Sequence, residues 1–126
     1  MFIPVIVFQS SMADRANCRT ELESAQFVEG VDFTLADNPI EAEVAVARGA
    51  RQMFVTGLVN GVQEDVDNLV RRMAAENPAI VTAFFSLFKL STNEDLYDMV
   101  IEKGSAPGPG SCDHLIATMR QFLLEG

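Results

Sequence analysis

The sequence has no tryptophan, one tyrosine, one histidine and two cysteines among its 126 residues. Cys18 and Cys112 do not form a Cys-x-x-Cys motif, and with only His114 beside them the chain lacks the ligand set of a structural zinc site. No apolar run approaches the roughly 18 residues that a membrane-spanning helix requires. The apolar segment at the start has no basic region before it and no cleavage pattern after it, so it does not have the pattern of a signal peptide. These absences favour a cytoplasmic protein with reduced thiols and no bound metal.

Basic residues are also scarce. Nine lysines and arginines stand against eighteen acidic residues, which gives a net charge of −9. A field of this sign repels nucleic-acid phosphates and anionic lipids, so neither nucleic acid nor a membrane is expected as a partner. The charge suits a basic protein partner, although a solvated acidic surface is the plainer interpretation.

What is present is the composition of one globular domain. Hydrophobic residues make up 48% of the chain and charged residues 21%, and 126 residues are enough to bury a single core. No repeat, linker or low-complexity segment divides the sequence. We therefore expect one domain over residues 1–124, with residues 125–126 as a remnant of cloning.

Short apolar segments alternate with longer amphipathic ones, a pattern typical of a parallel sheet covered by helices. Strands are predicted at 2–8, 30–35, 52–55 and 79–85, and helices at 11–25, 38–49, 62–77 and 111–124. Ser11 and Asn38 are expected to cap the first two helices, because their side chains accept hydrogen bonds from early helical amides. In the second helix Ile40, Val44 and Ala47 recur at helical spacing and are predicted to face the sheet.

The segment 87–110 allows two interpretations. A capping box at 91–94 favours a helix that runs to Lys103, whereas residues 97–101 have the apolar character of a fifth strand. We prefer the strand, because the helix would leave the last strand to 105–110, where two prolines and two glycines cannot form a good central strand. A short irregular or one-to-two-turn helix is then expected around 87–96, so the fourth helix of the pattern is short or missing.

Right-handed crossovers between such units predict an open, doubly wound α/β sheet. Its five parallel strands take the flavodoxin-like order 2-1-3-4-5, between two layers of helices. The switch point lies between the first and third strands, so a pocket there would be lined by Gln9, Ser10, Ser11, Thr56 and Gly57. None of these side chains is a carboxylate, and Mg²⁺ prefers anionic oxygen ligands. The sequence therefore argues against metal-dependent phosphoryl chemistry, and we expect no catalytic residue, metal or cofactor.

Two segments and the order of the elements carry a family resemblance. Residues 36–42 (Ala-Asp-Asn-Pro-Ile-Glu-Ala) open the second helix, and residues 77–81 (Asn-Pro-Ala-Ile-Val) lead into the fourth strand. Over nearly its whole length the chain resembles a receiver domain of bacterial two-component signalling, which implies a CheY-like fold. In that family two acids after the first strand and a phosphoacceptor aspartate after the third bind Mg²⁺ and receive the phosphoryl group. Here Gln9 and Ser10 stand at the acids, and Thr56 or Gly57 stands at the acceptor.

The resemblance implies two further site residues. The family's switch hydroxyl after the fourth strand falls at Ala83 or, with a shift of one residue, at Thr82, and its lysine after the fifth strand has Lys103 as a candidate. Because only one functional residue matches, the chain is interpreted as a degenerate pseudo-receiver. This is a signalling or regulatory module, not an enzyme, that acts by contact with a protein partner or with other domains of its own chain.

Four aromatic residues, Phe84, Phe85, Phe88 and Tyr97, lie where receivers present the output face of the fourth helix and fifth strand. A short fourth helix would leave apolar surface uncovered there, and exposed apolar patches mark interaction sites. These residues are therefore a predicted interaction face, with burial in the core as the alternative. The resemblance also implies a homodimer through the last strands and the final helix.

Two other functions stay open. The switch-point pocket could bind a small molecule or cofactor, and segment 108–111 loosely resembles a loop of cobalamin-binding domains. However, the first loop lacks the histidine of the cobalamin motif, and for a flavin phosphate it offers only Ser10 and Ser11. Alternatively, the chain is an assembly wing domain of a larger enzyme, like those that precede pyridoxal-phosphate decarboxylase cores, which predicts a long C-terminal continuation.

Overall fold

A computed structural model describes residues 2–57, 63–86, 94–104 and 110–125. Its five strands form one sheet in the order β2-β1-β3-β4-β5, and every neighbouring pair is parallel. The strands are β1 Val5–Phe8, β2 Phe33–Ala36, β3 Met53–Thr56, β4 Val81–Ser86 and β5 Met99–Glu102. The helices are α1 Met12–Ser24, α2 Pro39–Val44, α3 Gln63–Glu76 and α4 Asp113–Glu125, with a 3-10 turn η1 at Glu94–Leu96. The structure confirms the predicted flavodoxin-like fold and its strand order.

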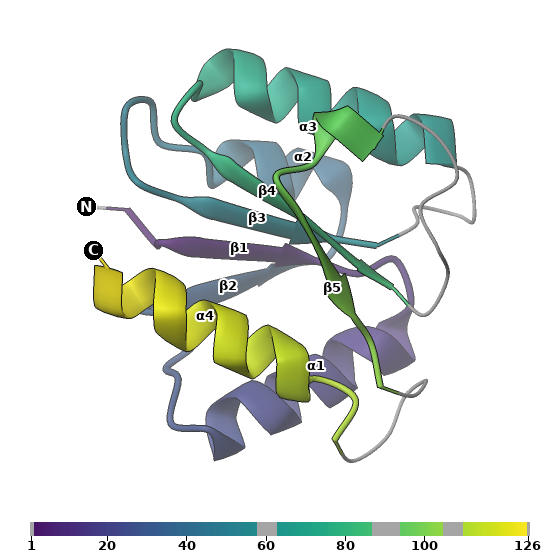
Figure 1. The fold of residues 1–126 in the computed structure, drawn as a ribbon, viewed down its shortest axis with the longest axis vertical. Helices are drawn as coiled ribbons and strands as arrows, with labels where there is room; N and C mark the ends of the chain where they lie inside the picture. The colour runs from purple at the N-terminus through teal and green to yellow at the C-terminus, as the bar shows by residue number, and fades with distance from the viewer. Residues whose placement is uncertain (1, 58–62, 87–93, 105–109, 126) are drawn as a thin grey trace.

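Helices cover both faces of the sheet. In Figure 1, α1 and α4 lie on one side, and α2 and α3 lie on the other. Successive strand residues point to opposite faces, so each strand contributes to two apolar clusters. Val5, Val7 and Val55 join the cluster under α1 and α4, and Ile6 and Phe54 join the cluster under α2 and α3. The central strands β1 and β3 are therefore buried along their whole length, whereas the edge strand β5 exposes Val100 and Glu102.

Helices α1 and α2 begin at the predicted caps, Ser11 and Asn38. The residues of α2 that face the sheet, however, differ from the predicted ones. Asn38 accepts a hydrogen bond from the Glu41 amide at 2.9 Å, as a helix cap does. The prediction that Ile40 and Val44 face the sheet is wrong, since they are 74% and 79% exposed. The helix is only six residues long and turns its small Ala42 inward instead. No helix in the described part of the chain is both long and apolar enough to cross a membrane.

The fifth strand settles the ambiguous segment in favour of the preferred interpretation. β5 pairs with β4 in parallel, and the Asp98 amide donates to the Thr82 carbonyl at 2.9 Å just before the strand begins. Of the segment around 87–96, only residues 94–96 are described, and they form η1. The predicted helix over 87–93 and the loop over 105–109 lie outside the described residues.

Three of the four residues in the predicted interaction face are core residues. Phe84 and Phe85 are fully buried, and Tyr97 is 6% exposed. The reason is that β4 lies between β3 and β5, so Phe84 packs beneath α3 and Phe85 beneath the α1–α4 layer. The rings of Phe84 and Tyr97 meet edge to face at 5.3 Å. Phe88 lies outside the described residues.

Candidate functional site

The carboxyl ends of three strands bring Gln9, Gly57 and Lys103 together at one edge of the sheet. These residues follow β1, β3 and β5 respectively. The Lys103 ammonium donates to the Gln9 side-chain oxygen at 3.2 Å, and both side chains are buried. A Cβ added at Gly57 would lie 2.9 Å from the Phe85 carbonyl oxygen, so a larger residue would force the backbone to shift. Gln9 and Gly57, two of the five predicted pocket residues, thus meet at the switch point of the sheet.

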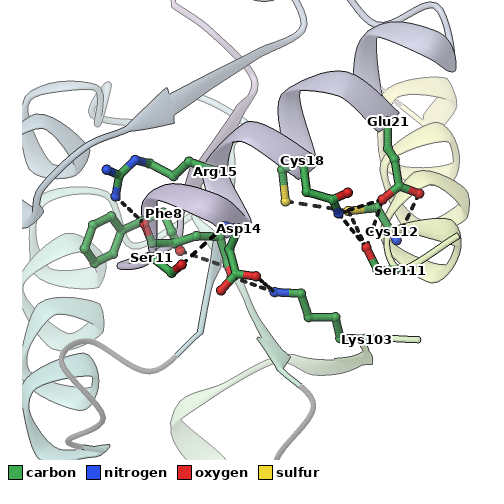
Figure 2. Close-up of polar contacts among 11 residues, drawn as sticks. Phe8, Ser11, Asp14, Arg15, Cys18, Glu21, Lys103, Ser111 and Cys112 are labelled. Atoms are coloured by element: carbon green, nitrogen blue, oxygen red, sulfur yellow. Dashed lines mark hydrogen bonds and ion pairs between the residues drawn. The ribbon is translucent and has the colours of Figure 1, made fainter. Parts of the chain in front are cut away.

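An aspartate from α1 completes this arrangement. The Asp14 carboxylate lies 3.1 Å from the Lys103 ammonium, and the two side chains point toward one another in Figure 2. The ammonium also lies 5.2 Å from the centre of the Phe85 ring. Only 5% of the Lys103 side chain is exposed, against 23% for Asp14. We call Gln9, Asp14, Gly57, Phe85 and Lys103 the Lys103 site; its cation is paired within the chain itself.

Sequence reasoning placed Asp14 only near the start of a helix and did not identify it as part of the site. Its amide donates to the Ser11 hydroxyl at 3.4 Å, so Asp14 stands in the first turn of α1. That helix begins soon after β1, which places its first turn above the ends of the strands. An acid in this turn, together with a lysine after the fifth strand, is the signal that could have identified the pair.

Arg15, the next residue of α1, holds the loop after β1. Its guanidinium donates to the Gln9 carbonyl at 2.9 Å and to the Ser10 carbonyl at 3.2 Å. The same group lies 3.4 Å from the Asp37 carboxylate, which follows β2. The predicted pocket residue Ser10 is exposed, and its backbone is fixed by this contact. Arg15 therefore joins two loops at the carboxyl edge of the sheet, a role that its sequence position did not reveal.

Thr56, a candidate for the acceptor position, directs its hydroxyl into its own backbone. The side chain is fully buried, and the hydroxyl donates to the Gly57 carbonyl at 3.2 Å. Its partners in the neighbouring strands are Phe8 and Phe84, both of which belong to the α2–α3 cluster. Thr56 therefore lies on the opposite face of the sheet from Phe85 of the Lys103 site.

The structure does not place the predicted switch-hydroxyl position, Ala83 or Thr82, at this edge. Thr82 pairs with Phe54, which lies two residues before the end of β3. Thr82 is therefore about 7 Å short of the edge where β3 ends. Its hydroxyl lies 3.2 Å from the Asp98 carboxylate, and Ala83 is buried in the α1–α4 cluster. This part of the prediction is wrong because β4 continues to Ser86.

Ser86 is the hydroxyl residue that β4 does place at its carboxyl end. It pairs with Glu102 of β5, and its carbonyl accepts a hydrogen bond from the Lys103 amide at 3.4 Å. Ser86 was missed because the predicted strand ended one residue too early. The available signal was the first hydroxyl residue after the apolar segment of β4.

The side chains of the Lys103 site fit a buried ion pair better than a metal ion. The residues that follow β1 and β3 supply an amide and a glycine, which are neutral. Mg²⁺ is bound through carboxylates, and the Asp14 carboxylate is already paired with Lys103. Within the described ranges, no group of three or more histidine, cysteine, aspartate or glutamate side chains could hold a metal. Phosphoryl transfer would in addition need an acceptor carboxylate, which neither Thr56 nor Gly57 supplies.

A second polar cluster lies beside the site, where α1 meets the start of α4. The Glu21 carboxylate accepts hydrogen bonds at 2.8 Å from the Asn17 amide, the Ser111 hydroxyl and the Gly110 backbone amide (Figure 2). Burial opposes the ionisation of Glu21, but the hydrogen bonds outweigh it and hold the pKa of this carboxyl below its ordinary value. Glu21 therefore fastens α1 to the segment that begins α4.

We expect Glu21→Gln to lower the free energy of unfolding by about 1–2 kcal/mol at pH 7. The glutamine side chain is neutral and has one acceptor oxygen, whereas the carboxylate accepts several hydrogen bonds with two charged oxygens. The folded-state pKa is depressed, so the ionised carboxylate stabilises the fold above its ordinary pKa of 4.5 and loses this effect as the pH falls through the folded-state pKa. The difference between wild type and variant should therefore shrink in acid, as measured by urea unfolding at several pH values. Glu23→Gln, on an exposed position of the same helix, is the matched control. A difference that stays constant from neutral pH to pH 3, by contrast, would contradict this role.

No known protein-family model matches the sequence, and no curated protein sequence matches it. Three solved structures are similar in fold. A response regulator from Thermotoga maritima is 21% identical, with a TM-score of 0.64 over 98% of this chain and 99% of the other. An adenylate cyclase from Rhodopirellula baltica is 12% identical, with a TM-score of 0.60 over 98% and 93% of the two chains. A candidate pilus assembly protein from Burkholderia thailandensis is 9% identical, with a TM-score of 0.64 over 98% and 99%.

These similarities extend over the whole domain, but the identities are low. They show that the chain has the receiver-like fold of a response regulator. They do not transfer any activity, since proteins with three different roles share this fold. The similarities therefore establish the fold of the chain and not its role.

Proposed function

We propose that this chain is a receiver-like signalling or regulatory module that is not phosphorylated and acts by contact with another protein. The observation that carries the proposal is the Asp14–Lys103 pair, whose atoms lie 3.1 Å apart. In receivers, as the resemblance implies, a lysine after the fifth strand belongs to the same set of functional residues as the phosphoacceptor aspartate. Here the Asp14 carboxylate on α1 lies beside Lys103, so the lysine charge is balanced without a phosphoryl group.

The residues at the strand ends support the same conclusion. Gln9 takes the place of an acid, and its neutral side chain accepts a hydrogen bond from Lys103 but adds no negative charge for a metal ion. The Phe85 carbonyl oxygen lies close to Gly57, so a phosphoacceptor aspartate at position 57 would require the backbone to move. The site therefore stabilises one arrangement of α1, β3 and β5, and we infer a fold retained for contact.

The charge of the chain supports a partner of opposite sign. With a net charge of −9, long-range attraction favours a basic protein surface or a basic region of the same chain. The same charge disfavours nucleic acid and anionic membranes as partners. A cytoplasmic location and a homodimer remain predictions, and sedimentation velocity of the purified chain tests the dimer.

A thermal-shift experiment tests whether the site responds to phosphoryl chemistry. The chain is heated with Mg²⁺ and beryllofluoride, a phosphoryl mimic, and is separately incubated with acetyl phosphate. We expect the melting temperature to change by less than about 1 °C, because a ligand stabilises a fold only if it binds the native state. Intact mass should show no added phosphoryl group.

A receiver domain with a complete acidic pocket serves as the positive control, since it confirms that the reagents are active. A saturable rise in melting temperature with beryllofluoride, or a phosphorylated mass, would overturn the proposal. Flavin and cobalamin are included as further arms. A rise with either cofactor would replace the contact module with the cofactor-binding alternative.

A further inference from the structure

Two buried thiols lie against each other beside the Lys103 site. The sulfur atoms of Cys18 on α1 and Cys112 before α4 are 3.6 Å apart, although the residues are 94 positions apart in the sequence. Both side chains are fully buried and unbonded. A disulfide has an S–S length of about 2.05 Å, so the sulfurs must approach by only about 1.5 Å to form one. Two elements that meet here can thus be joined without refolding.

Both thiols belong to the apolar cluster under α1 and α4, but polar groups reach the Cys112 sulfur at the edge of that cluster. The Cys112 sulfur lies 3.9 Å from the Ser111 hydroxyl and 4.0 Å from the Asn17 amide nitrogen. Both polar groups belong to the cluster around Glu21. Buried structural cysteines are inert when their surroundings are apolar, whereas polar and cationic surroundings favour the reactive thiolate.

The two thiols are not equivalent. The hydrogen bond with Cys112 lowers the pKa of Cys18 against the opposing effect of burial; the positive charge of Lys103 also lowers it, whereas the negative charges of Asp14 and Glu21 raise it. The same hydrogen bond, together with burial, raises the pKa of Cys112. We assign the attack on an oxidant to Cys18, whose thiolate the Lys103 charge stabilises, and the resolving step to Cys112.

From this geometry we infer that Cys18 and Cys112 form a peroxide-sensitive dithiol, which hydrogen peroxide converts into a reversible disulfide between α1 and the start of α4. The Cys18 thiolate attacks one peroxide oxygen, so that an S–O bond forms and the O–O bond breaks. The hydroxide released takes up the Cys18 proton and leaves as water. The Cys112 sulfur then attacks the sulfenic sulfur, forms the S–S bond and releases a second water, so two thiols and one peroxide give one disulfide and two waters.

Burial determines how this site reacts. Peroxide reaches the sulfurs through local opening of the contact between α1 and α4, so oxidation is slower than at an exposed thiol. Once Cys18 is oxidised, Cys112 lies close enough to react before further peroxide arrives. The product is therefore a disulfide and not a sulfinic acid.

The disulfide would affect both charged residues of the Lys103 site, because Cys18 is on the helix of Asp14 and Cys112 is next to a residue that is bonded to the Lys103 segment. Cys18 stands one helical turn after Asp14 on α1. Cys112 follows Ser111, whose carbonyl accepts a hydrogen bond at 3.1 Å from the amide of Gly104, the residue after Lys103. A bond between the two sulfurs thus links the segments that carry the two charges of the site. This inference goes beyond the proposed function and does not depend on it.

The test oxidises the folded, reduced chain with a small excess of hydrogen peroxide. We expect the intact mass to fall by two hydrogens, and non-reducing peptide mapping to find one cross-linked pair that contains Cys18 and Cys112. The melting temperature should rise by roughly 5–15 °C and return after treatment with dithiothreitol, because the bond closes a long loop.

Variants identify the order of the two thiols. In Cys112→Ser, whose hydroxyl can still donate to the Cys18 sulfur, Cys18 should accumulate as a sulfenic acid that dimedone traps, whereas Cys112 in the matched variant Cys18→Ser should be trapped at least tenfold more slowly. The cross-link in the wild type requires no variant, so a poorly folded variant leaves the main test intact. Overoxidised cysteine without the cross-link, oxidation confined to methionine, or a disulfide that forms only in denaturant would each overturn the inference.

Discussion

Replacing Asp14 with alanine is expected to lower the free energy of unfolding by about 3 kcal/mol, because it leaves the Lys103 ammonium buried without its counter-charge. The Lys103 side chain is 5% exposed, so water cannot replace the lost carboxylate without opening the site. Breaking a buried pair typically costs about 3–5 kcal/mol, and the lower end applies because Gln9 still accepts a hydrogen bond from the ammonium. Urea unfolding followed by circular dichroism measures the change.

The reverse substitution is the control, and it should be milder. Lys103→Met removes the cation but keeps an apolar stem against the Phe85 ring, and the Asp14 side chain, 23% exposed, keeps some contact with water, although its Oδ1 atom, which faces Lys103, is buried. We expect a loss of about 1–2 kcal/mol in this variant. The double variant should be little worse than Lys103→Met alone, because no unpaired charge is then buried. Strictly additive losses would show that the two charges do not interact, and would remove the observation on which the proposed function rests.

The sequence was sufficient to predict the strands because each is a short, mainly apolar segment between cap or turn residues. The fifth strand followed from excluding a central strand rich in proline and glycine, and β5 at Met99–Glu102 confirms that step. The face of α2 could not be obtained in this way. Ile40 and Val44 have helical spacing, but a helix of six residues is oriented by the loops at its ends and by its closest contact, which here is Ala42.

Only the residues of the Lys103 site that directly follow strands could be predicted from the sequence. Gln9 and Gly57 follow their strands directly, so the strand order implies that they meet. The partner of Lys103 was not predictable from spacing, because the contact joins side chains from α1 and from the end of β5. The contact between the two thiols was not predictable for the same reason. Cys18 and Cys112 are far apart in the sequence, and only the packing of α1 and α4 on the same face of the sheet brings their sulfurs together.

Phe84→Ala is expected to lower the free energy of unfolding by about 3–5 kcal/mol, since it removes a fully buried ring from the α2–α3 cluster. The loss also removes the edge-to-face contact with Tyr97, whose hydroxyl donates to Asp67 at 2.8 Å. Thermal and urea unfolding, compared with wild type, measure this effect.

Val100 provides a control at the same level of the sheet, because it is the direct partner of Phe84 in β5. Val100 is 59% exposed, so Val100→Ala should change the stability by no more than about 0.5 kcal/mol. If Phe84 belonged to an exposed interaction face, as the sequence suggested, the two substitutions would have similarly small effects. If Phe84→Ala lowers the free energy of unfolding much more than Val100→Ala does, the Phe84 ring must lie in the core. In that case any contact surface on this side of the sheet must be built from residues such as Val100, and not from the aromatic cluster beneath it.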